Sequence, residues 1–344
     1  MVQPPLLSSL PQELQEMVAS HLTRHDYTVS VRVSQAWKQL FIPFIWRHID
    51  VTEDDFREMA HSDSLRTHEQ WVQSISLAGY ADFIQEFLQH SPARYPKLVS
   101  LEFINPESDS LIKDFITRAS SAGSGGGGLK RLVISGFDGF DDFGGGATDA
   151  LLLHASTLEV VRLDMMPGMS SKDIQQLLSS APNLREFDIA GDQRDIEYEG
   201  LFLDARDMIS SEWVCTKLEI FACRIGGIPR PDITGDINGK PASKYLKSGT
   251  IEESMELHQG VYSQLARLTR LKEVTLRVRI KAAWRQGRTN ERYRLYDCPA
   301  MSLASGMGVL KGLKELETVC LDDMEDEDKE WVKEHWPKVN KVVP

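Results

Sequence analysis

The chain has 344 residues, with 39 Lys and Arg against 51 Asp and Glu, which gives a formal net charge of −12. Hydrophobic residues make up 41% and charged residues 26%, so collagen-like, wholly disordered and disulfide-dense proteins are excluded. The negative charge argues against general binding to nucleic acid or anionic membranes, because phosphate contacts need clustered cations.

The chain carries no signal for secretion or membrane insertion. No stretch approaches 18 consecutive apolar residues, and the N-terminus lacks the basic start of a secretory signal. Four cysteines, Cys215, Cys223, Cys298 and Cys320, form no C-x-x-C pair, which disfavours a structural zinc site. We expect them to pack as small apolar residues, in a protein of the cytoplasm, the nucleus or both.

Residues 8–50 contain no glycine and are predicted to form a compact unit of three helices. An apolar stripe at the helical period runs along the first of them: Leu10, Leu14, Met17, Val18 and Leu22. A second helix is predicted from Val29 to Phe41, and a third apolar group surrounds Pro43. So small a unit either buries these residues in its own core or offers the surplus to a partner.

The order of residues in this unit resembles the F-box motif. The sequence reads Leu10-Pro11-Gln12-Glu13-Leu14, then Met17-Val18, Leu22, a V-x-x-x-W helix from Val33 to Trp37, and Pro43-Phe44-Ile45-Trp46. It departs from the family at Ser34, where Cys is frequent, and at Ile45, where Leu is frequent. The resemblance covers residues 6–50 and implies a three-helix F-box.

The resemblance also implies a partner, because F-box units bind a Skp-type adaptor that links them to a cullin–RING ubiquitin ligase. It places the following residues at or near that interface: Leu10, Pro11, Leu14, Met17, Val18, Leu22, Val33, Trp37, Pro43 and Trp46. Some of them must instead form the core of the unit. For Val33 and Trp37 both interpretations stay open.

From residue 70 onward one hexad recurs eight times: apolar, two variable, apolar, one variable, apolar. Its copies begin at Val72, Leu98, Leu129, Leu158, Leu184, Leu218, Leu271 and Leu316. The first four intervals run from 26 to 31 residues, which suits leucine-rich repeats, and the last two hold insertions. Each copy predicts a short strand with alternate residues buried. Helical patterns lie between the copies, at 81–90, 110–119, 170–180 and 262–267.

These copies resemble the irregular leucine-rich repeats often found behind F-boxes. We therefore expect an α/β fold with an F-box at 6–50, a linker at 51–70 and a leucine-rich-repeat solenoid at 71–344. The solenoid is expected to have a curved parallel sheet with outer helices, and insertions near 224–262 and 280–310. A doubly wound α/β sheet would also alternate strands and helices, but it would not require the same hexad each time. The final helix and residues 339–343 are expected to cap the stack.

Variable positions of the hexads face the open groove of such a solenoid, which is the usual place for a protein partner. The basic residues predicted to bind a target there are Arg131, Arg162, Arg224, Arg277 and Arg279. The last two belong to a basic region at 267–294. That region is either a solvated strand edge and loop, or a pocket whose guanidinium groups grip an acidic or phosphorylated segment.

No sequence motif points to catalysis. The glycine runs at 125–128 and 144–146 fail the phosphate-loop pattern, and the stretch from Thr234 to Tyr245 lacks the Glu that closes a calcium loop. We expect no cofactor, no metal and no enzymatic activity in the chain itself. The resemblance implies a substrate-recognition subunit of an SCF-type ubiquitin ligase with an unknown target. The alternative is a repeat scaffold whose partners are not degraded.

Overall fold

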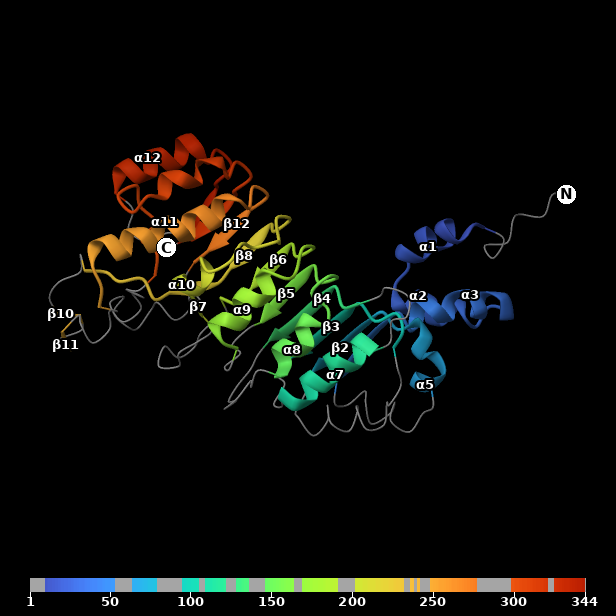
Figure 1. Ribbon diagram of the computed structural model, residues 1–344. Helices are drawn as coiled ribbons and strands as arrows, with labels where there is room; N and C mark the ends of the chain where they lie inside the picture. Colours follow the sequence, from blue (N-terminus) through green and yellow to red (C-terminus); the bar gives the residue numbers. More distant parts are fainter. Residues whose placement is uncertain are drawn as a thin grey trace.

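The computed structural model describes residues 10–52, 64–78, 95–104, 109–121, 128–135, 146–163, 169–190, 202–231, 236–237, 240–241, 248–276, 298–320 and 325–343. Its framework is a ten-stranded parallel sheet whose strands follow one another in chain order. The strands are β1 (His48–Thr52), β2 (Ser74–Ala78), β3 (Ser100–Ile104), β4 (Arg131–Ser135), β5 (Val160–Leu163), β6 (Glu186–Asp188), β8 (Ile220–Ala222), β12 (Glu273–Thr275), β13 (Thr318–Cys320) and β14 (Lys341–Val343). Figure 1 shows the helices on one face of this sheet, with the N-terminal helices at one end of the stack.

All eight predicted hexads supply a strand of this sheet. The apolar positions that the structure describes are buried: Val72, Ile75 and Leu77 are each 0% exposed, and the described positions of the later copies repeat the pattern. The register places Ile75 opposite Leu101 and Leu101 opposite Leu132. Because equivalent residues stack on one another, the copies share one continuous core. The structure is thus α/β with a large parallel sheet flanked by helices, as predicted, and it is consistent with a solenoid.

The sheet extends one strand beyond the predicted copies at each end. Strand β1 pairs with β2 so that Ile49 lies opposite Ile75. Trp46 is therefore the first residue of an additional hexad. The repeat pattern did not predict this copy, because a tryptophan stands where the other copies have leucine or valine. The sheet begins at His48, inside the range assigned to the F-box. The range assigned to a linker holds the end of β1, the helix α5 (Ser64–His68) and the turn η2 (Glu69–Trp71).

Three helices precede the sheet: α1 (Gln12–Ser20), α2 (Arg24–Ser30) and α3 (Gln35–Ile45). The predicted continuous helix from Val29 to Phe41 is wrong, because the chain turns at residues 31–34. Two caps account for the difference. Thr23 and Asp26 form a capping box at the start of α2, and the Ser34 hydroxyl accepts a hydrogen bond from the Trp37 N–H (3.2 Å) at the start of α3.

The outer helices include α7 (Asp109–Ser121), α8 (Gly146–Leu152), α9 (Ser171–Leu178), α10 (Ala205–Met208), α11 (Ile251–Ala266) and α12 (Asp326–His335), with the turn η6 (Met307–Gly312). The predictions at 110–119 and 170–180 agree with α7 and α9, and 81–90 lies outside the described residues. The pattern at 262–267 is the end of the longer α11, most of which lies in the predicted insertion. That insertion also contains β9 (Arg224–Gly226), which pairs with β7 (Phe202–Asp204), and the hairpin of β10 (Asp236–Ile237) and β11 (Lys240–Pro241).

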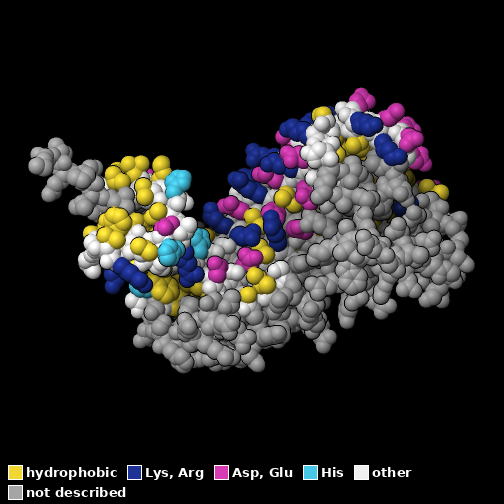
Figure 2. Space-filling model, turned by 180° about the vertical axis from the view of Figure 1, so that it is seen from behind, with side chains coloured by type: hydrophobic (Ala, Val, Ile, Leu, Met, Phe, Trp, Pro, Cys, Tyr) yellow, Lys and Arg dark blue, Asp and Glu magenta, His cyan; other side chains and the backbone are white. Residues whose placement is uncertain are grey.

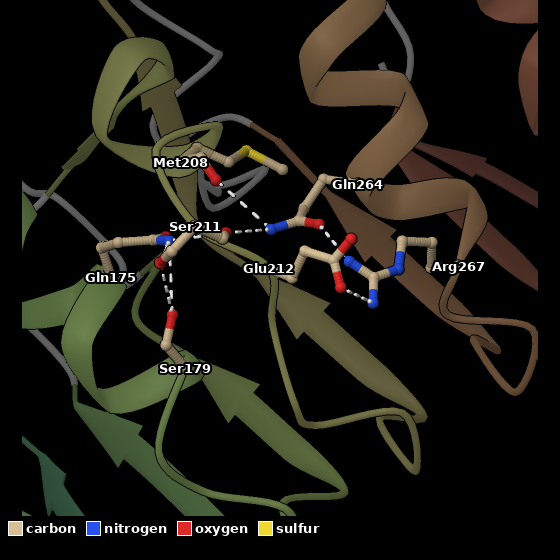
Figure 3. A network of polar contacts seen from close by, with 7 residues as sticks. All are labelled: Gln175, Ser179, Met208, Ser211, Glu212, Gln264 and Arg267. Atoms are coloured by element: carbon tan, nitrogen blue, oxygen red, sulfur yellow. Dashed lines mark hydrogen bonds and ion pairs between the residues drawn. The ribbon is translucent and has the colours of Figure 1, made fainter.

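A polar network joins the insertion helix α11 to the repeat stack (Figure 3). Gln175 of α9 donates from Nε2 to the Ser211 hydroxyl (2.8 Å) and to the Ser211 carbonyl (3.0 Å). Gln264 of α11 donates to the same carbonyl (2.8 Å), and Arg267 donates to Gln264 Oε1 (3.2 Å) while pairing with Glu212 (2.9 Å). Buried amides are costly to leave unpaired, so this network fixes the position of α11 on the stack.

One buried histidine ties three segments of the stack together. His154 is 1% exposed, its Nδ1 accepts a hydrogen bond from the Leu129 N–H (3.0 Å), and its Nε2 donates to the Ile116 carbonyl (3.0 Å). Both bonds together require the neutral ring. Burial lowers the pKa of His154 below its ordinary value.

This shift predicts a pH-dependent stability. The unfolded ring titrates near its ordinary pKa of about 6.5, so the chain takes up a proton on unfolding at lower pH, and stability falls as the pH drops below that value. We expect His154→Gln to be less stable than wild type near pH 7.5, as measured by urea unfolding, and the difference to narrow toward about pH 5.5. A difference that stays constant between those pH values would contradict this account of His154.

Among the described residues, no helix is both long and apolar enough to cross a bilayer.

Candidate partner-binding surfaces

The N-terminal helices expose a set of aliphatic side chains. We call these residues the apolar surface: Leu14 (42% exposed), Met17 (58%), Val18 (37%), Val29 (50%) and Val33 (61%). Figure 2 shows hydrophobic side chains gathered over this end of the molecule. Single exposed apolar residues are ordinary, but five within twenty residues of a small helical unit indicate a surface that a partner covers.

These side chains remain outside because aromatic rings fill the interior of the unit. Tyr27 of α2 lies 5.8 Å from Phe41 and 5.9 Å from Phe44, ring centre to ring centre, and both phenylalanines belong to α3. The Trp37 ring meets Phe41 edge-on at 5.7 Å, and Phe41 is 1% exposed. Rings with this much area are sufficient for the core of so short a unit, so the aliphatic residues of α1 and α2 are left at the surface.

The structure divides the residues that the sequence predicted to bind an adaptor. The exposed members are Pro11, Leu14, Met17, Val18 and Val33, and the half-buried members are Leu10, Leu22, Trp37, Pro43 and Trp46. Of the two residues with open interpretations, Val33 lies on the surface, and Trp37 is half-buried with its ring against Phe41. Val29 was not predicted as part of the surface, because the motif residues do not include it.

Trp46, which the motif places at or near the adaptor interface, is half-buried and contacts the repeat stack. Its side chain packs against the core of the repeat stack, and its ring lies 4.9 Å from that of His68. The next carbonyl, of Arg47, accepts hydrogen bonds from the backbone N–H groups of Gln73 (2.9 Å) and Ser74 (3.0 Å). Trp46 therefore links α3 to the first strand, and the helical unit continues directly into the sheet.

The structure describes three of the arginines predicted to bind a target, and each of them contacts a neighbouring side chain. Arg131 lies 3.8 Å from the Glu102 carboxylate, and Arg162 donates to Glu186, a hydrogen bond that raises the pKa of Arg162. The guanidinium of Arg224 lies over the Phe202 ring, 5.3 Å from its centre. Arg277 and Arg279 lie outside the described residues. The described arginines therefore do not form a purely cationic pocket.

The pair of Arg162 and Glu186 is expected to matter for stability because the Glu186 side chain is 11% exposed. Arg162→Met would leave this carboxylate without its donor, so we expect a loss of about 1–2 kcal/mol in urea unfolding. The double variant Arg162→Met/Glu186→Gln should recover part of that loss.

A matched control is the pair of Lys130 and Glu159 (2.9 Å), whose side chains are 55% and 36% exposed. Lys130→Met should leave the free energy of unfolding unchanged within error, because exposed ion pairs contribute little. Equal losses of unfolding free energy in Arg162→Met and Lys130→Met would show that burial of the Glu186 carboxylate does not determine the loss.

Six successive strands of the sheet, from β4 to β13, are each preceded by a charged residue, and the sign of the charge alternates. From β4 to β13 this row reads Lys130, Glu159, Arg185, Glu219, Lys272 and Glu317. Lys272 pairs with Glu219 at 2.6 Å, and the hydrogen bond between them lowers the pKa of Glu219. Figure 2 shows basic and acidic side chains intermingled along this side of the molecule. Opposite charges at neighbouring strands neutralise one another, which keeps this row polar without a net field.

The alternating row includes one residue of the basic region predicted at 267–294. Within its described part, Lys272 belongs to the row and Arg267 is paired with Glu212. These contacts favour the solvated-edge interpretation for Arg267 and Lys272. Residues 277–294, which the pocket interpretation would need, lie outside the described residues.

Cysteine and metal chemistry give no alternative site in the described part of the chain. Cys215, Cys223 and Cys298 are buried and form no disulfide, and burial raises the pKa of Cys215 to about 12. The described residues hold no cluster of three or more His, Cys, Asp or Glu side chains that could bind a metal ion. The three thiols thus pack as small apolar residues, as predicted.

Comparison with solved structures gives a distant likeness. No protein-family model and no curated protein matches the chain. The structure is similar to a chain in the crystal structure of the Rad7 and Elc1 complex in yeast, at 12% sequence identity and a TM-score of 0.39, over 96% of this chain and 78% of that chain. Because the identity and the TM-score are both low, we base no further step on this likeness.

Proposed function

We propose that the chain is the substrate-recognition subunit of a cullin–RING ubiquitin ligase. In this proposal the N-terminal helices are an F-box that binds a Skp-type adaptor, and the repeat sheet holds the target protein. The observation that carries the proposal is the apolar surface. Leu14, Met17 and Val18 have the spacing of the F-box motif and are exposed to solvent.

Exposed aliphatic residues favour docking, because their burial by a partner stabilises the complex. Burial of a Val, Leu or Met side chain that was fully exposed stabilises a complex by about 1.5–3 kcal/mol, and these side chains are already 37–61% exposed. Interfaces concentrate such apolar residues at their centre and surround them with a polar rim. The exposed Glu13, Glu16 and Ser20 of α1 could supply part of that rim.

The direct connection between α3 and β1 supports a role in positioning. A ligase receptor must hold its target at a defined place relative to the adaptor, and here only Trp46 and Arg47 separate α3 from β1. Figure 2 shows both surfaces on one side of the molecule, with a hollow between the helical unit and the rising face of the sheet. In the proposed assembly, a target in this hollow lies beside the adaptor, in the cytoplasm or the nucleus.

The proposed function is tested by the turnover of proteins that the chain binds in cells. Partners captured on the full chain should be degraded more slowly when Leu14→Asp/Met17→Asp replaces wild type, because the adaptor no longer connects them to the ligase. Leu153→Asp is the matched control, since Leu153 is 60% exposed and lies after α8, outside the helical unit. Equal half-lives in all three would favour the alternative, a repeat scaffold whose partners are not degraded.

A further inference from the structure

Helix α1 is packed differently from the other two helices of its unit. It has nine residues, of which only Ala19 is buried. Its three large aliphatic side chains, Leu14, Met17 and Val18, belong to the apolar surface. The face of α1 that would normally stabilise a helix by tertiary packing is thus directed to solvent.

The contacts of α1 are also weaker than those between α2 and α3. The rings of Tyr27, Trp37, Phe41 and Phe44 lock α2 to α3, whereas α1 contains no aromatic residue. The polar contacts between α1 and the residues that follow it include a hydrogen bond from the Tyr27 hydroxyl to the Ala19 carbonyl, and the pair of Glu16 and Arg47 at 3.8 Å. The Glu16 and Arg47 side chains are 45% and 29% exposed, and ion pairs this exposed contribute little.

The start of α1 lacks the cap that the neighbouring helices have. Thr23 and Ser34 accept hydrogen bonds from the first turns of α2 and α3. The N-cap of α1 is Pro11, which makes no side-chain capping bond. An uncapped helix of nine residues is marginal in water, because nucleation is costly and few backbone bonds offset it.

We propose that α1 is only partly folded in the free chain and becomes fully helical when a partner covers Leu14, Met17 and Val18. The inference rests on the proposed function, which names that partner as a Skp-type adaptor. When a segment folds on binding, the observed association constant is the intrinsic constant multiplied by the fraction of free chains in which that segment is already formed. The smaller this fraction is for α1, the weaker the observed binding. The adaptor would then act as the element that completes the helical unit.

Hydrogen exchange of the full-length chain, read by mass spectrometry, tests this directly. In the free chain we expect the amides of residues 14–20 to exchange at least about 10-fold faster than those of α9, which buries four of its eight residues. Addition of the adaptor should slow exchange in α1 by at least about 10-fold and leave α9 unchanged. Free-chain protection of α1 equal to that of α9 would overturn the inference.

A pair of substitutions at an exposed position of α1 gives an independent test. Glycine disfavours a helix by about 1 kcal/mol relative to alanine, which corresponds to about 5-fold in a binding constant. If α1 folds on binding, Glu13→Gly should bind the adaptor about 5-fold more weakly than Glu13→Ala. Equal affinities of the two variants would show that α1 is already formed in the free chain.

These outcomes separate the inference from the proposed function. If the chain binds the adaptor and α1 is already protected before binding, the proposed function stands and the inference is wrong. If the folded chain does not bind the adaptor, both are wrong.

Discussion

Replacement of Phe187 by alanine is expected to lower the free energy of unfolding by about 3–5 kcal/mol, the cost of a large cavity in a packed core. Phe187 is 0% exposed in β6, and its ring lies 6.2 Å from that of Phe221 in β8. The Phe221 ring in turn lies 5.2 Å from Trp213. Because the core is continuous from strand to strand, the cavity should weaken the contact between neighbouring repeats as well as the site itself.

Urea unfolding followed by circular dichroism measures this loss. Phe187→Leu, which keeps much of the volume, should cost less than about 1.5 kcal/mol, and Leu153→Ala at a site 60% exposed should cost less than about 0.5 kcal/mol. Equal stabilities of Phe187→Ala and Leu153→Ala would contradict the stacked core that defines this fold.

Leu14→Asp is expected to lower the affinity for a Skp-type adaptor by about 100-fold without a change in the melting temperature of the repeat domain. An aspartate in the middle of the apolar surface would have to lose its water without gaining a partner, which is costly at the centre of an interface. The side chain is 42% exposed in the free chain, so the fold loses little. Titration calorimetry gives the affinity, and thermal unfolding gives the stability.

Two other variants distinguish binding from folding. Leu153→Asp should bind the adaptor like wild type, because Leu153 lies outside the helical unit. Trp46→Ala should lower stability, since Trp46 packs on the repeat core. A wild-type affinity of Leu14→Asp for the adaptor would show that α1 is not part of the interface. The F-box interpretation would then lack its main support.

The repeat framework was predictable because one pattern was present many times. A single hexad such as the one at Leu184 is compatible with a strand or a helix, but eight copies in series indicate a stacked parallel sheet. The two terminal strands were missed for a local reason. Trp46 opens the first of them in place of leucine, and Lys341–Val343 forms the last in a stretch predicted only as a cap.

The candidate surfaces were predictable only in part, because exposure depends on what packs nearby. The sequence placed Met17 and Trp37 together as motif residues, but ring packing against Phe41 buries part of Trp37 and leaves Met17 outside. It also placed Arg162 among the residues that bind a target, and in the structure Arg162 donates to Glu186 of the neighbouring strand β6. The aligned hexads predict the register of neighbouring strands, but they do not say which side chains on adjacent strands pair.

The most direct test of the central claim is whether the purified wild-type chain and a purified Skp-type adaptor form a complex. We expect size-exclusion chromatography with light scattering to show one species with the summed mass of one adaptor and one 38.8 kDa chain. Separate elution of the two proteins, with the chain shown to be folded by circular dichroism, would contradict the account. The N-terminal helices would then be an end cap of the repeat stack.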